Sequence, residues 1–219
     1  MPPLGGGRGP FTPRVKAPDP MRKFSKIWLD VETGLAAPSQ GQMRPPGAAS
    51  REEKGRVMDR QDVTRELGQP GARELLESAT VARLAYNGPD DLPRVIPIAF
   101  YWDGERIVVC TATTSPKVQA LSARPEVAIA IDVGDTPAAA KSLLVRGVAN
   151  LETVDGVAGE YLLAAKKALD PETHAAFEGH VRSMYEQQVR ISIEPQWARF
   201  YDFGAGRLPA FLTQLAAST

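Results

Sequence analysis

The chain has 219 residues, of which 43% are apolar, enough to form the core of one ordinary domain or of two small ones. Its 26 basic side chains are balanced by 26 acidic ones, which argues against a surface built as a whole for nucleic acid. The only cysteine, Cys110, lies in an apolar run, so we expect a buried, unreactive thiol. No Cys/His group has zinc-site spacing, so we expect no metal site. No apolar run is long enough to span a membrane, so we expect a soluble cytoplasmic protein with no membrane partner.

Residues 1–57 differ in composition from the rest of the chain. They contain nine Pro and eight Gly, a content typical of disordered sequence, and ten basic against five acidic side chains. A short apolar patch at 24–31 is either a docking motif or a chance cluster, and we favour the second interpretation. We therefore predict a disordered Pro/Gly-rich N-terminal extension over 1–57 and a folded domain over 58–219.

The first part of the folded domain is predicted to be helical and then to form antiparallel strands. A helical pattern covers 59–78 and is interrupted by Gly and Pro at 68–71. Pro97 lies in the second strand, which places that strand at a sheet edge or at a bulge. The three predicted strands, separated by a turn cluster and by an Asp-Gly hairpin signal, are 80–87, 94–102 and 106–110.

The second part of the domain alternates strands with helices. The sequence predicts a short helix at 117–123, ended by a proline, and then strands at 126–132 and 141–154, the second with a bulge at Gly147. Two helices are predicted at 155–169 and 171–187. A closing pair of strands is predicted at 189–193 and 197–203, hinged at Glu194 and Pro195. Five to seven short antiparallel strands with a few helices are typical of a small β-barrel with helical additions. No Gly-x-Gly-x-x-Gly follows a strand, which argues against a dinucleotide-binding fold.

The stretch from Cys110 to Pro125 carries the clearest functional signal. Ser115 suits a helix N-cap, and Pro116 suits the first helical position. Lys117 follows at once, so its ammonium, the free N–H groups of the helix start and the hydroxyls of the preceding threonines converge. Such a point favours an anion, a phosphate above all. The alternative is an ordinary helix cap followed by a solvated lysine.

Several motifs of the chain together resemble the pyridoxamine 5′-phosphate oxidase-like family of flavin-binding split β-barrels. They are ARLAY, RVIPIAFYW, VVCTATTSPKVQALSARPEVAIAID and LLVRGVANLE. The most specific is T-x-x-x-S-x-K, followed by a helix and by R-P-E-V-A with a hydrophobic strand. The resemblance covers residues 70–154 well and the C-terminal part loosely. It implies a mainly β fold with helices, of the α+β class: a six-stranded antiparallel split β-barrel of the FMN-binding type.

The resemblance also implies where a cofactor binds. Members of the family hold the flavin phosphate with an arginine of the second strand and with a serine and a lysine at the helix start. These positions correspond to Arg94, Ser115 and Lys117, while Thr111 is implied to meet the flavin ring or its ribityl chain. The full set of implied cofactor-binding residues is Arg94, Val95, Ile96, Pro97, Thr111, Thr114, Ser115, Lys117 and Trp197. No catalytic acid or base is expected, because the flavin itself is the reactive group.

The implied function is that of an oxidoreductase that uses FMN, or alternatively a deazaflavin, on an unidentified small molecule. The family implies a homodimer with the cofactor at the interface. Ala99 and Pro116 stand where the true oxidases carry basic residues, and their C-terminal Arg-x-His is absent, which argues against pyridoxamine phosphate as the substrate. The acidic tail of a deazaflavin would need further cations, for which Arg83 and Arg106 are candidates. The alternatives are a non-catalytic protein that binds or sequesters flavin or haem, and an adaptor with a basic tail.

Other candidate residues have simpler interpretations. Arg146 lies in the middle of a strand and is predicted to pair with Asp132 across the sheet, with a ligand contact as the alternative. His174 and His180 are six residues apart, which places them on different faces of a helix, facing solvent, and does not predict a metal pair. The lysine pair at 166–167 is predicted to belong to a solvated face.

Overall fold

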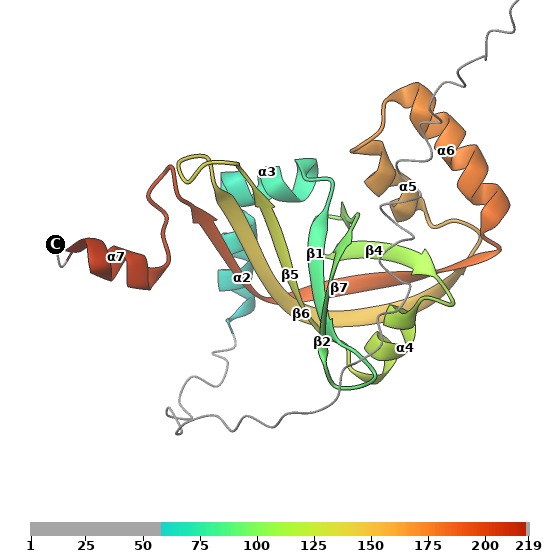
Figure 1. Ribbon diagram of the computed structural model, residues 1–219, viewed down its shortest axis with the longest axis horizontal. Coiled ribbons are helices and arrows are strands. Elements are labelled where there is room, and N and C mark those ends of the chain that lie inside the picture. Colours follow the sequence, from blue (N-terminus) through green and yellow to red (C-terminus); the bar gives the residue numbers. More distant parts are fainter. Residues whose placement is uncertain (1–57, 218–219) are drawn as a thin grey trace, which may run out of the picture. The chain divides into compact units, whose positions relative to one another are not determined.

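The computed structural model describes residues 58–217, so the predicted extension over 1–57 lies outside the described residues. Within this range the strands form a seven-stranded sheet with antiparallel neighbours, in the order β2-β1-β5-β6-β7-β4-β3 (Figure 1). The strands are β1 (Ala82–Asn87), β2 (Pro93–Ile98), β3 (Tyr101–Trp102), β4 (Ile107–Ala112), β5 (Glu126–Val133), β6 (Lys141–Asp155) and β7 (Gln187–Asp202). The helices are α2 (Arg60–Leu67), α3 (Pro70–Ser78), α4 (Pro116–Ala123), α5 (Gly159–Lys166), α6 (Pro171–Met184) and α7 (Ala210–Ala217). The predicted combination of an antiparallel sheet with helices is confirmed.

The two edge strands of the sheet are neighbours along the chain. β2 pairs with β1 and β3 pairs with β4, although only Ala99 and Phe100 separate β2 from β3. Phe100 is completely buried in the hydrophobic core. At this residue the chain leaves the pairing of β2 with β1 and enters the pairing of β3 with β4. The segment predicted as one strand over 94–102 is therefore two strands, and the sheet has seven strands rather than six. Pro97 does lie on an edge strand, as predicted.

The long strands β6 and β7 pair along almost their whole length, with one irregularity. The register shifts between Arg146 and Gly147, so that Gly147 faces Pro195. A side chain at Gly147 would collide with the backbone carbonyl of Glu194, which explains why glycine occupies this position. The predicted bulge is confirmed. The predicted strand pair hinged at 194–195 is wrong, because the bulge absorbs the irregularity and β7 continues as a single strand.

The main core lies between one face of the sheet and the helices α2 and α3. α2 packs on β7, and α3 contacts β3, β5, β6 and β7. α4 contacts β1 and β6, while α5 contacts β3 and β4 and carries α6 on its other side (Figure 1). The helix predicted over 155–169 is shorter in the structure, because β6 runs on to Asp155. No helix within residues 58–217 combines the length and the apolar character needed to cross a membrane.

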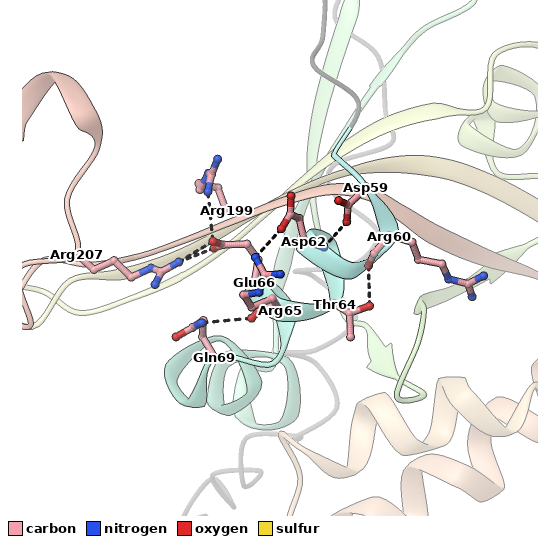
Figure 2. Close-up of polar contacts among 9 residues, drawn as sticks. All are labelled: Asp59, Arg60, Asp62, Thr64, Arg65, Glu66, Gln69, Arg199 and Arg207. Atoms are coloured by element: carbon pink, nitrogen blue, oxygen red, sulfur yellow. Dashed lines mark hydrogen bonds and ion pairs between the residues drawn. The ribbon is translucent and has the colours of Figure 1, made fainter.

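A buried carboxylate fastens α2 to the C-terminal part of the sheet (Figure 2). Glu66 is 8% exposed, and its carboxylate accepts hydrogen bonds from Arg207 at 2.7 and 2.8 Å. It also accepts one from Arg199 at 3.2 Å and one from the backbone N–H of Phe200 at 3.0 Å. A single side chain thus joins α2, β7 and the segment that leads to α7.

Lys167, directly after α5, does not belong to a solvated face as predicted. Its Nζ lies 3.7 Å from the ring centre of Phe100 and donates to the carbonyl oxygen of Leu76 at 3.4 Å. Half-burial in this apolar setting lowers the pKa of Lys167 to about 8. The ammonium therefore connects α5 with the end of α3 and with the link between β2 and β3.

Replacing Lys167 with methionine is expected to remove a pH dependence of stability between about pH 8 and pH 10.5. The pKa of Lys167 falls from 10.5 to about 8 on folding, so the unfolded chain binds the proton more tightly over this interval. The free energy of unfolding of the wild type should therefore rise with pH there. We expect a rise of about 1 kcal/mol, because the half-exposed group is screened by water. Urea denaturation of both proteins across this interval measures it, and a constant difference between them would contradict the prediction.

Candidate functional site

Three of the predicted site residues meet where β4 gives way to α4. Thr111 ends the apolar part of β4, a short turn follows, and Lys117 lies in the first turn of α4. The Nζ of Lys117 donates to Thr111 Oγ1 at 3.1 Å and to Ser115 Oγ at 2.5 Å. Ser115 and Lys117 are only 5% and 6% exposed. We call Thr111, Ser115 and Lys117 the lysine cluster.

The geometry of the helix start differs from a simple cap. Ser115 occupies the N-cap position with an extended backbone, and Pro116 follows as predicted. The hydroxyl of Ser115, however, makes no capping hydrogen bond to the helix and instead accepts from the ammonium of Lys117. The lysine cluster therefore combines a positive charge, two hydroxyl groups and a helix N-terminus, the kind of groups that suit a phosphate.

The structure does not bring Arg94 to the lysine cluster. Its guanidinium pairs with Asp90 at 2.7 Å and donates to the carbonyl oxygen of Leu92 at 3.3 Å, both in the turn between β1 and β2. That turn lies beside the end of α4, where Arg124 donates to the carbonyl oxygen of Gly88 at 2.6 Å. The lysine cluster is at the other end of this eight-residue helix, about 10 Å away along its axis.

The remaining predicted residues of β2 divide between the two faces of the sheet. Ile96 packs against the main core and Ile98 belongs to it, whereas Val95 is 64% exposed and Pro97 is also exposed. Val95 and Pro97 therefore lie on the outer face of the sheet, opposite the core. Thr114 is exposed in the turn before α4.

Trp197 lies on the same outer face as Val95. Following the pairing from strand to strand, one row crosses five strands and contains Val95 on β2, Ala85 on β1, Ala128 on β5, Arg146 on β6 and Trp197 on β7. We call these five residues the outer row. The guanidinium carbon of Arg146 lies 4.4 Å from the ring centre of Trp197.

The predicted ion pair between Arg146 and Asp132 is wrong. Asp132 faces Ser142 across the sheet and its carboxylate pairs with Arg83. Arg146 faces Ala128 and stacks on Trp197 instead. The importance of this stacked pair could not be read from the sequence, because it depends on the register after the bulge.

Trp197 and the lysine cluster lie far apart within one chain. Thr111 pairs with Val189 of β7, and Trp197 follows eight residues later on the same strand. Eight residues of extended strand span about 26 Å. One copy of the chain therefore does not gather the predicted site residues in one place: the lysine cluster, the turn that holds Arg94 and the outer row are separate.

The structure also places the cysteine and the two histidines considered in the sequence. Cys110 is 7% exposed, and burial together with the charge of Glu160 raises the pKa of its thiol to about 12, which agrees with the predicted unreactive thiol. His174 does not face solvent as predicted, since its Nε2 lies 2.9 Å from the carbonyl oxygen of Leu162, whereas His180 is exposed. Within residues 58–217, no three His, Cys, Asp or Glu side chains are grouped to hold a metal ion.

Comparisons with solved structures find proteins that are similar to part of this chain. One is a conserved hypothetical protein from Mycobacterium tuberculosis, with 22% identity over 70% of this chain and 90% of that chain and a TM-score of 0.48. An F420 reductase has 25% identity over 59% of this chain and 97% of its own, with a TM-score of 0.41. A heme storage protein from Vibrio cholerae has 16% identity over 59% of this chain and 92% of its own, with a TM-score of 0.45. No curated protein matches the sequence significantly.

The family assignment rests on a sequence comparison that covers more than half of the chain. The family model described as pyridoxamine 5′-phosphate oxidase matches residues 70–196. The matched segment contains α3, all strands from β1 to β6, most of β7, and the lysine cluster. The chain therefore belongs to the pyridoxamine 5′-phosphate oxidase-like family.

Proposed function

We propose that the protein is an oxidoreductase that binds a phosphate-bearing flavin-type cofactor, FMN or a deazaflavin, and acts on a small molecule. The observation that carries the proposal is the lysine cluster: a buried ammonium held by two hydroxyls at the start of a helix. Membership of the pyridoxamine 5′-phosphate oxidase-like family supports it independently.

Each residue of the lysine cluster has a distinct task in this proposal. Lys117 donates charge-assisted hydrogen bonds to the phosphate. Ser115 and Thr111 fix the position of the Lys117 ammonium by accepting hydrogen bonds from it. When bound, the flavin supplies the hydride or electron transfer, while the protein orients it and sets the polarity around the ring.

The same proposal includes a homodimer with the cofactor at the interface. One chain does not bring Trp197 to the lysine cluster, so the predicted site is complete only if a second copy contributes. The exposed Val95 gives the edge strand β2 an apolar side chain on the outer face that a second copy would cover. Because only two residues join the edge strands β2 and β3, the fold also supports a split barrel that closes at Phe100.

The partners of Arg83 and Arg106 weaken the case that these two arginines hold the acidic tail of a deazaflavin. The two arginines considered for an acidic tail are both engaged. Arg83 pairs with Asp132, and Arg106 pairs with Asp103 at 3.0 Å within the β3–β4 turn. Releasing either arginine for a tail would leave a carboxylate without its partner, which lowers the gain from the new contact.

The proposal is tested by the visible absorbance spectrum of the purified protein and by titration with FMN and with the deazaflavin. We expect saturable binding of FMN, one cofactor per chain, to a species with the mass of a dimer. Binding of neither cofactor would contradict the proposal. A bound chromophore that exchanges no electrons with any added reductant or substrate would support the alternative of a non-catalytic flavin- or haem-binding protein.

A further inference from the structure

Arg146 differs from the other arginines of the outer face in having no carboxylate partner. Arg83 pairs with Asp132, and Arg199 pairs with Glu66 at 3.2 Å. In the described part of the chain, no hydrogen bond or ion pair joins Arg146 to another residue, and its contact is the stack on Trp197. Arg146 is an exposed residue, so a ligand on the outer face can reach its N–H donors.

The stack on Trp197 prepares Arg146 for a planar anion. A guanidinium that lies over an indole ring loses less side-chain freedom on binding than an unsupported one. The edge of the guanidinium carries parallel N–H donors that match the two oxygens of a carboxylate. Arg146 supplies one positive charge and, within residues 58–217, has no unpaired cation beside it. One such charge suits a monoanion better than a phosphate dianion, because a dianion is usually bound by several donors.

The residues of the outer row next to Arg146 have small side chains. Ala128 is the direct cross-strand neighbour of Arg146, and Ala85 follows on the next strand, before the exposed Val95. From Val95 to Arg146 the row crosses three strand spacings, about 14 Å. A flat ring can lie over the alanines with an anionic group directed at the guanidinium.

We propose that the outer row binds a planar molecule bearing a carboxylate, with its ring over Ala85 and Ala128 and its carboxylate on Arg146. This inference rests on the proposed function, because it names the substrate class for the same face of the sheet. It assigns Arg146 as the residue that selects an acid over its neutral analogue, and Trp197 as the residue that positions Arg146.

The experiment uses 2-naphthoate and its neutral isostere 2-naphthamide as probes, with isothermal titration calorimetry on the full chain. We expect the wild type to bind 2-naphthoate about 10- to 100-fold more tightly than 2-naphthamide, the range of a charge-assisted hydrogen-bonded pair. Arg146→Gln should lose this preference, and Arg146→Lys should recover only part of it, because an ammonium lacks the planar fork.

Arg83→Gln serves as the matched control, since it removes one positive charge from the same face at a residue already paired with Asp132. It should change 2-naphthoate affinity by less than about threefold, the effect of an exposed charge. Equal binding of the two probes by the wild type, no binding of 2-naphthoate, or an equal loss in Arg83→Gln and Arg146→Gln would overturn the inference. FMN titration of the same samples reports on the proposed function separately, so the two failures are distinguishable.

Discussion

Replacing Glu66 with alanine is expected to lower the free energy of unfolding by about 3 kcal/mol. Glu66 is 8% exposed and accepts four hydrogen bonds, two from Arg207, one from Arg199 and one from the backbone of Phe200. Removing the carboxylate leaves the buried N–H of Phe200 without an acceptor. It also leaves Arg199 and Arg207 without their anion (Figure 2). The arginine side chains are 45% and 38% exposed and regain water, which holds the loss at the lower end of the range for buried pairs.

Urea denaturation at neutral pH measures this loss as a shift of the midpoint at constant slope. Glu74→Ala is the matched control, because Glu74 pairs with Lys141 at a similar distance, 2.9 Å, but is 62% exposed. That exposed pair should contribute less than about 1 kcal/mol. If the two variants lost the same stability, the carboxylate of Glu66 would not fasten α2 to β7 as the contacts indicate.

The importance of Glu66 could not be predicted from the sequence. In the sequence it is one glutamate among several charged residues of a helix. Its partners Arg199 and Arg207 lie 133 and 141 residues later in the chain. A local sequence pattern predicts contacts between residues that are close along the chain. The burial of the Glu66 carboxylate depends on elements that are distant in the sequence and come together only on folding.

The start of α4 could be predicted because its signals are local. Ser115, Pro116 and Lys117 follow one another, and Thr111 is six residues from Lys117, so no long-range register is needed to bring them together. The sequence did not show that the Ser115 hydroxyl turns to the ammonium instead of capping the helix. That choice follows from the burial of Lys117, which needs polar partners inside the protein.

The contact between Arg146 and Trp197 could not be predicted from the sequence pattern. With regular pairing beyond Gly147 and Pro195, Arg146 would face Gln196; the bulge shifts it by one residue to Trp197. Sequence predicted the bulge at Gly147 but not which strand holds the extra residue. A shift of one position exchanges the two faces of a strand, so the partner of Arg146 followed only from the structure.

Replacing Lys117 with methionine is expected to weaken FMN binding by about 1–3 kcal/mol, or about 5- to 150-fold in Kd, because one charge-assisted contact to the phosphate is lost. Methionine keeps much of the apolar stem and avoids a large cavity at a side chain that is 6% exposed. Titration followed by flavin fluorescence measures the change. Lys166→Met is the matched control, since Lys166 is exposed at the end of α5 and should leave the affinity unchanged.

Riboflavin separates the phosphate contact from any general disturbance of the site. It has the ring and ribityl chain of FMN but no phosphate, so the wild type and Lys117→Met should bind it with similar affinity. The difference between the losses for FMN and for riboflavin is the coupling free energy between Lys117 and the phosphate. An equal loss for both ligands would place Lys117 outside the phosphate contact, because the variant would then act through the shape of the cluster around Thr111 and Ser115 rather than through its charge.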